Sequence, residues 1–186
     1  MSNEKGDHSF WRVLSLVAML IISTTRVMAE TPTDNIACAS LSTVNLRNSR
    51  INHLKFVDGK ACESDGLPGK CDWEHKINQD QLLYPTAHKQ IRLIVITANH
   101  LTGSGSWDTV FMFDCLAGSL KKIFEKRYLY GVKIEKSKDG TLIFTSGVWK
   151  ENDPMCCPSE RKYETYRWSP DKNTYVLSST ASAEKN

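Results

Sequence analysis

Two adjacent cysteines near the C-terminal end, Cys156 and Cys157, have the most distinctive chemistry in this sequence. They lie in the stretch NDPMCCPSE, between Pro154 and Pro158. Adjacent thiols could form a redox pair, or each could be half of a structural disulfide. Redox pairs of the thioredoxin type use a Cys-x-x-Cys spacing and a helix N-terminus that lowers the thiol pKa. The sequence around this pair offers neither, so structural bridges are the favoured interpretation.

The histidines are the next candidates, because they could bind a metal ion. A zinc site needs Cys or His ligands at paired short spacings. The histidines considered, His53, His75, His88 and His100, are instead scattered through the chain. The sequence therefore predicts no metal site, and it offers no motif for a cofactor.

A glycine- and serine-rich stretch, TGSGS at Thr102–Ser106, could in principle hold a phosphate or a nucleophile. A phosphate-binding loop also needs a lysine and a following helix, whereas Trp107 and a strand pattern follow here. A hairpin turn is therefore expected. A hydrolase would need a nucleophile beside a base, and His100 with Ser104 is the candidate pair, although no Gly-x-Ser-x-Gly motif is present. A small secreted hydrolase at this pair is the alternative to a non-catalytic protein.

The N-terminus indicates the compartment in which the protein works. A polar segment with Lys5 and Arg12 precedes the apolar run VLSLVAMLIIS, and Val27-Met28-Ala29 follows it. This pattern is typical of a secretory signal peptide over residues 1–29, cleaved after Ala29. The run is shorter than the about 20 residues of a spanning helix, and an uncleaved anchor is the minority alternative. The sequence thus predicts a periplasmic or secreted protein without a stable membrane span after cleavage.

Export makes disulfides the expected state of the cysteines. All six, an even number, follow the predicted signal peptide. Cys62 and Cys71 flank ESDGLPGK, whose glycines and proline turn the chain back, so these two are expected to pair. Neighbouring residues in extended chain point to opposite sides, so Cys156 and Cys157 are expected to bond different partners. Cys38 and Cys115 remain as those partners.

The middle and end of the chain predict a mainly β protein with few helices. The apolar runs are short, rich in β-branched and aromatic residues, and separated by turn residues. The expected strands are Ile91–Ala98, Thr109–Cys115, Val132–Lys136, Thr141–Gly147, Tyr163–Trp168 and Thr174–Ser179. Two further segments, Asn78–Tyr84 and Leu120–Arg127, are ambiguous. The prediction is a single antiparallel β meander or sandwich-like domain, stapled by disulfides, over residues 36–180.

Within these strands, side-chain alternation gives more specific expectations. Tyr166 and Trp168 share one face of their strand and are expected to face the core. Asp108 and Asp114 flank an apolar strand, so they are expected to mark its solvated ends rather than to form a catalytic pair. Residues 30–35 and 181–186 are expected to be loose ends.

A resemblance to other proteins rests on five segments of the chain: GSGSWDTVFMF, CLAGSL, GVKIEKSKDGTLIFTSG, NDPMCCPSE and the following YRW. Together they resemble a group of exported bacterial β-rich proteins of unknown function with a DPMCCPS-type motif. The mycobacterial LppP/LprE lipoproteins are more distantly similar. The resemblance covers residues 91–177 and implies export and a β-rich fold, but no activity. The chain lacks a lipobox, so a lipid anchor is not implied.

These observations favour a binding or inhibitor-like module, with an envelope or extracellular protein or a small ligand as its partner. The formal charge of +3 is too small to indicate nucleic acid. Disulfide-stapled β domains outside the cytoplasm often present a rigid surface to a partner, and exposed aromatic residues anchor such interfaces. The residues selected as possible partner-binding aromatics are Trp107, Tyr128, Tyr130 and Trp149, with Tyr84 as a further one to examine.

Overall fold

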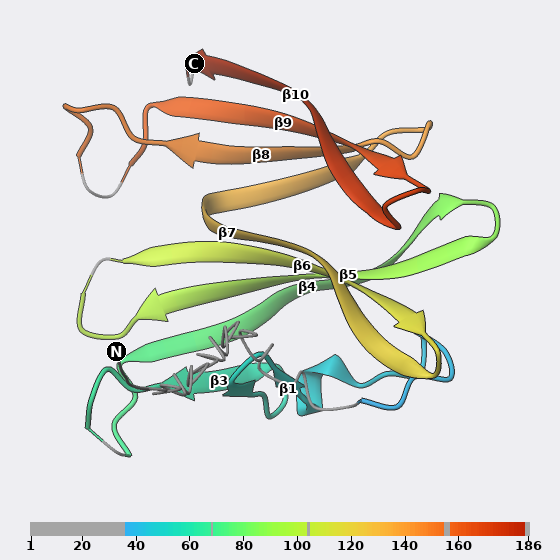
Figure 1. Cartoon of the computed structure of the whole chain (residues 1–186). Coiled ribbons are helices and arrows are strands. Elements are labelled where there is room, and N and C mark those ends of the chain that lie inside the picture. Colours follow the sequence, from blue (N-terminus) through green and yellow to red (C-terminus); the bar gives the residue numbers. More distant parts are fainter. Residues whose placement is uncertain (1–35, 68, 104, 155–156, 185–186) are drawn as a thin grey trace, which may run out of the picture.

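The computed structural model describes residues 36–67, 69–103, 105–154 and 157–184, and its main element is an antiparallel sheet of eight strands (Figure 1). The strand order is β10-β9-β8-β7-β6-β5-β4-β3, so each strand pairs with its neighbours in sequence. The sheet strands are β3 (Lys60–Glu63), β4 (Trp73–Thr86), β5 (Lys89–His100), β6 (Ser106–Leu116), β7 (Ser119–Lys136), β8 (Leu142–Val148), β9 (Glu160–Ser169) and β10 (Thr174–Glu184). The predicted mainly β, antiparallel meander is confirmed.

Strands β5 and β6 are buried on both faces, which explains why their sequences are nearly continuous apolar runs. Ile94 and Ile96 of β5 belong to one hydrophobic core, and Leu93 and Val95 belong to another. Since side chains alternate between the two faces of a strand, the two cores lie on opposite sides of the same pair of strands. The sheet therefore needs a cover on each side.

The N-terminal segment covers the first core. This segment contains a short 3₁₀ helix, η1 (Leu46–Asn48), and a small hairpin of β1 (Arg50–Ile51) and β2 (Leu54–Lys55). Leu46 and Phe56 are almost fully buried against the sheet. The disulfide Cys38–Cys115, with a Cα–Cα distance of 5.6 Å, fastens this segment to the end of β6.

The C-terminal half of the sheet covers the second core. Leu142 and Phe144 of β8, Tyr166 of β9 and Tyr175 of β10 are all buried there against β5 and β6. Trp168 packs against the same group. The prediction that Tyr166 and Trp168 face the core is confirmed.

Strand β7 joins the two halves of the sheet and bends sharply between them (Figure 1). Its register against β6 shifts between the pairs that contain Asp108 and Val110 of β6. Its register against β8 shifts between the pairs that contain Tyr130 and Lys133 of β7. Such shifts mark β-bulges, which bend a strand and redirect its side chains. Tyr128 lies within the first of these shifts. It has a left-handed φ of 59°, a conformation that is uncommon for a bulky residue and costs about 1–3 kcal/mol.

Several sequence-based expectations differ from the structure. The ambiguous segments Asn78–Tyr84 and Leu120–Arg127 are strand, within β4 and β7. Strand β10 runs to Glu184, beyond residue 180 where the domain was expected to end. Asp108 and Asp114 are buried rather than solvated, because each has partners inside the protein: Asp108 accepts from Thr97 and Val132, and Asp114 from Lys89 and Asn173.

The disulfides confirm one expected pairing and correct the other. Cys62 and Cys71 are bonded, as predicted, with a Cα–Cα distance of 5.4 Å. The expectation that Cys38 and Cys115 pair with Cys156 and Cys157 is wrong, because Cys38 and Cys115 bond each other. Cys157 is also disulfide-bonded, while Cys156 lies outside the described residues. In the described part of the chain, no helix has the length and apolar character needed to span a membrane.

Candidate functional site

A pocket of about 300 Å³ opens on the face of the sheet that the N-terminal segment only partly covers. One side is the β1–β2 hairpin, through Asn52, His53 and Leu54, and the other side is formed by strands β3 to β7. The pocket continues the first core, since Ile96 and Phe111 belong to both. It lies at the lower end of the size range of pockets that hold small molecules, about 300–1,000 Å³.

Small side chains in the floor create this space. Ala98 of β5 lies between His75 of β4 and Trp107 of β6 in the sheet register. Thr109 of β6 pairs with Ile96 and also lines the pocket. Directly opposed residues on adjacent strands have Cβ atoms about 5 Å apart, so a small residue between two large ones leaves a depression.

An aromatic wall forms one side of the pocket. The rings of Trp73 and Trp107 have centroids 4.5 Å apart and are tilted by 40°, and the rings of Trp107 and Tyr128 are 6.2 Å apart at 62°. His100 also contacts Trp73, in a T-shaped arrangement with centroids 4.5 Å apart. Tyr128 is 75% exposed, so the positive φ at this bulge places a ring at the rim of the pocket instead of in a core.

A second pocket, of about 350 Å³, shares Trp107 and Tyr128 with the first. Tyr130 and Trp149 line it, and their ring centroids are 4.4 Å apart. The structure therefore brings together all four aromatic residues that the sequence selected. Tyr84, the fifth aromatic to be examined, is exposed near the end of β4 and lines neither pocket.

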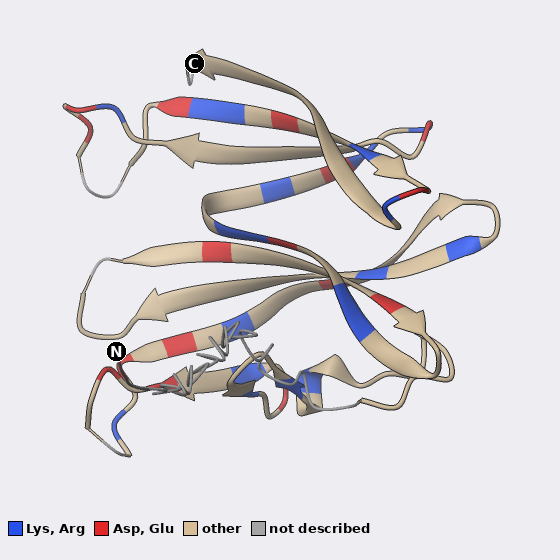
Figure 2. Cartoon of the chain, in the orientation of Figure 1, with Lys and Arg blue, Asp and Glu red and all other residues tan. Residues whose placement is uncertain are grey.

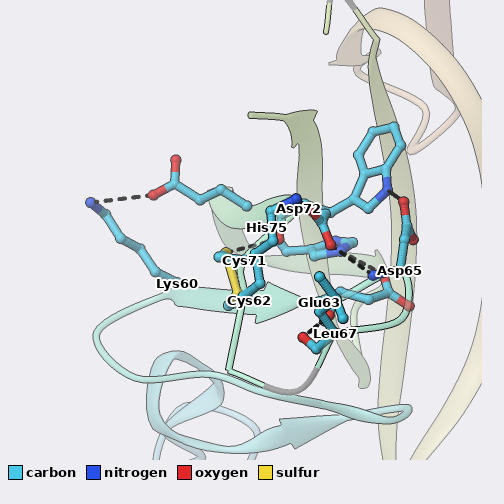
Figure 3. Close-up of a disulfide and its surroundings, with 12 residues drawn as sticks. Lys60, Cys62, Glu63, Asp65, Leu67, Cys71, Asp72 and His75 are labelled. Atoms are coloured by element: carbon cyan, nitrogen blue, oxygen red, sulfur yellow. Dashed lines mark hydrogen bonds and ion pairs between the residues drawn. A yellow bond between two sulfur atoms is a disulfide. The ribbon is translucent and has the colours of Figure 1, made fainter. Parts of the chain in front are cut away.

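A further part of the first pocket's lining is acidic and comes from the disulfide loop, which the Cys62–Cys71 bridge closes (Figure 3). Glu63 follows Cys62 directly, and Asp65 lies within the loop. The carboxylate of Asp65 accepts a hydrogen bond from Trp73 Nε1 at 2.8 Å. Asp72, after Cys71, accepts from the backbone N–H of Asp65 at 3.0 Å and pairs with Lys70 at 2.8 Å. These bonds fix the acidic loop against the aromatic wall.

Glu63 is shared by two histidines. His53 Nε2 lies 2.8 Å from Glu63 Oε1, and His75 Nε2 lies 2.9 Å from Glu63 Oε2. Burial alone would raise the pKa of Glu63, but the hydrogen bonds from His53 and His75 outweigh it and leave that pKa lowered. Glu63 is therefore ionised at neutral pH, and its two oxygens tie the β1–β2 hairpin and β4 to β3.

Arg127 is the remaining charged residue of the lining, and its charge is balanced locally. Its Nε forms an ion pair with Glu125, and this pairing raises the pKa of Arg127. Both signs of charge occur along β4, β7 and β9 (Figure 2). The acidic loop therefore sets the local charge of the pocket.

The residues of the hydrolase alternative are only partly described. His100 Nδ1 lies 3.3 Å from Thr102 Oγ1, and Ser104 lies outside the described residues. Among the described residues, no group of three or more His, Cys, Asp or Glu side chains is placed to hold a metal ion. His53 and His75, scattered in sequence, do meet at Glu63.

Sequence reasoning missed Trp73, Glu63, Asp65 and the two histidines as members of one site. A signal was available, because the predicted Cys62–Cys71 bridge places Glu63 and Trp73 on facing strands, and the two residues pair in the sheet. The alignment of His75, Ala98 and Trp107 across three neighbouring strands depends on the strand register, which was not predicted from the sequence. No protein-family model, curated protein or solved structure matches the chain.

Proposed function

We propose that this protein is an exported, non-catalytic binding module whose binding site is the pocket between the aromatic wall and the acidic disulfide loop. The observation that carries the proposal is the connected series Trp73, Trp107 and Tyr128 beside an open depression of about 300 Å³. Concave, largely apolar pockets with a few fixed polar groups are the usual form of a ligand site. The occupant is a small ligand or a side chain of an envelope or extracellular partner.

The backbone at Tyr128 supports this assignment. An aromatic residue with a positive φ, in a strand interior and 75% exposed, gains little from packing. Strained residues of this kind cluster at binding and active sites, where the surrounding structure holds them. Here the bulge of β7 and the contact with Trp107 hold Tyr128 at the rim.

Binding at this pocket is tested by thermal unfolding of the mature protein in the presence of a library of small metabolites and short peptides. A ligand that binds only the folded state raises the unfolding temperature. We expect at least one compound to stabilise the wild type and the Tyr84→Ala control, but not Trp107→Ala. If every compound that stabilises the wild type stabilises Trp107→Ala equally, the pocket is not the binding site.

Export is the second part of the proposal. It is supported by the signal-like residues 1–29, by the disulfides and by the resemblance of the NDPMCCPSE region to exported bacterial proteins. We expect the mature chain to begin at Glu30. Intact-mass measurement of the protein from the native envelope fraction tests this, and retention of residues 1–29 would contradict it.

The alternative hydrolase at His100 and Ser104 predicts a different result. His100 would then be needed for turnover of an ester or peptide substrate. Its ring instead makes a T-shaped contact with Trp73, which is a packing role next to the aromatic wall. Hydrolysis that the wild type performs and His100→Ala does not would replace the binding proposal with the catalytic one.

A further inference from the structure

The shape of the aromatic wall restricts what the pocket can hold. A flat ligand such as the face of a sugar ring needs a flat aromatic platform. The three rings are instead turned relative to one another, by 40° between Trp73 and Trp107 and by 62° between Trp107 and Tyr128. They therefore form a curved wall, which fits a rounded group better than a planar one.

The charge of the lining restricts the ligand further. Two carboxylates, Glu63 and Asp65, and one guanidinium, Arg127, line the pocket. Arg127 is already paired with Glu125, so the carboxylates of Glu63 and Asp65 are the negative groups that the lining leaves unbalanced by a Lys or Arg. The pocket thus carries a net negative charge, which favours a cation and opposes an anion.

Aromatic rings and carboxylates both attract a cation. The face of an aromatic ring carries negative charge density and attracts a cation within about 6 Å of the ring centroid, most strongly for Trp. A methylated ammonium is rounded and apolar at its surface, so it contacts several rings at once without requiring hydrogen bonds. Asp65 lies beside this wall, held by Trp73 Nε1.

We propose that the pocket binds a ligand with a methylated ammonium group, which packs against the wall formed by Trp73, Trp107 and Tyr128, near the carboxylates of Glu63 and Asp65. This inference rests on the proposed binding function and assigns the chemical class of the ligand. The three rings supply the contact surface, and the disulfide loop supplies the charge. The floor at Ala98 leaves room for the methyl groups.

The test compares choline with 3,3-dimethyl-1-butanol, which has the same shape but carries carbon in place of the charged nitrogen. Titration calorimetry at neutral pH, with the tryptophan fluorescence followed in parallel, measures both. We expect choline to bind at least about tenfold more tightly than the neutral compound. Tetramethylammonium should compete with choline.

Variants locate the site. Trp107→Ala should abolish measurable choline binding. Asp65→Asn removes one negative charge and should weaken binding about threefold to tenfold, and Tyr84→Ala should leave it unchanged. Circular dichroism and thermal unfolding of each variant show whether it is folded. If Trp107→Ala is unfolded, Tyr128→Ala replaces it, because Tyr128 is exposed and removing its ring leaves the cores intact.

The possible failures are distinguishable. Equal affinity for choline and 3,3-dimethyl-1-butanol, or no binding of choline and tetramethylammonium, overturns the cationic class. If in that case a disaccharide or another neutral compound binds the wild type and not Trp107→Ala, the binding function stands and only its ligand class is wrong. If choline binds the wild type and Trp107→Ala equally, the site is elsewhere.

Discussion

The carboxylate of Asp108 accepts a hydrogen bond from the backbone N–H of Val132 at 2.8 Å, although 24 residues separate them in the chain. Asp108 lies in β6, beside Trp107 of the aromatic wall, and Val132 lies in β7, within the second bulge and four residues after Tyr128. The bond satisfies an N–H group that the irregular register of β7 would otherwise leave without a ladder partner. Asp108 thus fixes the bend of β7, and with it the position of Tyr128.

The first prediction concerns this bond. Asp108→Ala leaves the Val132 N–H and the Thr97 hydroxyl without their acceptor inside the protein. We expect the free energy of unfolding to fall by about 2 kcal/mol, measured by urea unfolding. Asp108→Asn retains an acceptor oxygen and should lose less. Equal losses for the two variants would show that the hydrogen bond to Val132 is not what Asp108 contributes.

The second prediction separates the two described disulfides. Replacing Cys62 and Cys71 by Ser opens a loop with a sequence separation of 9, which should cost about 2–3 kcal/mol. It should also weaken ligand binding, because this bridge positions Glu63 and Asp65.

The matched comparison replaces Cys38 and Cys115 by Ser, which opens a separation of 77. This bridge closes a longer loop and should cost more stability, about 4 kcal/mol, while affinity at the pocket is kept. Stability is measured by urea unfolding and affinity by calorimetry. The prediction is wrong if the affinity at the pocket falls in proportion to the lost stability in both variants. It requires the affinity to fall only when the Cys62–Cys71 bridge is absent.

The third prediction concerns Glu63 and acid. Burial acts to raise the pKa of Glu63, but the bonds from His53 and His75 lower it below 4.5 overall. A carboxyl with a lowered folded-state pKa contributes stability that is present above pH 4.5 and is lost as the pH falls through the folded-state value. Urea unfolding at a series of pH values should show this loss in the wild type. In Glu63→Gln the corresponding slope should be smaller, and an unchanged slope would refute the prediction.

The fourth prediction concerns Asp139, in the turn between β7 and β8. Hydrogen bonds from the Ser137 hydroxyl, and from the backbone and hydroxyl of Thr141, lower the pKa of Asp139 from 3.8 to about 2. Its contribution to the turn is therefore complete above pH 3.8 and is lost only as the pH falls through about 2. Carboxyl NMR titration measures this value directly. Ser137→Ala should move it upward, and a wild-type value near 3.8 would contradict the structure.

The sequence predicted the strands well where both faces of a strand are buried. Residues 91–98 and 109–115 are mainly apolar on both faces because a core lies on each side of them. Residues 120–127 were ambiguous because charged residues interrupt the apolar pattern. In the structure some of these charges pair within the segment, since Lys122 and Arg127 both contact Glu125. Lys126 instead pairs with the buried Glu164 at 2.6 Å, a contact between strands far apart in sequence.

The candidate site was predicted only in part. Candidate exposed aromatic residues can be selected from the sequence. The four that were selected, Trp107, Tyr128, Tyr130 and Trp149, do come together. Their arrangement depends on the bulges of β7, and bulges have no reliable signal in a single sequence. The first pocket likewise depends on how far the N-terminal segment extends over the sheet, which is decided by packing between distant segments.

The pairing of Cys38 with Cys115 has a consequence for biogenesis. This bridge encloses the Cys62–Cys71 bridge, so native pairing does not follow the order of cysteines along the chain. If the protein crosses a membrane from its N-terminus, Cys38 emerges first and Cys62 next, well before Cys115. An oxidant that joins cysteines as they appear would form Cys38–Cys62, which only thiol–disulfide exchange can correct. Production of the native protein should therefore depend on a disulfide isomerase as well as on an oxidase.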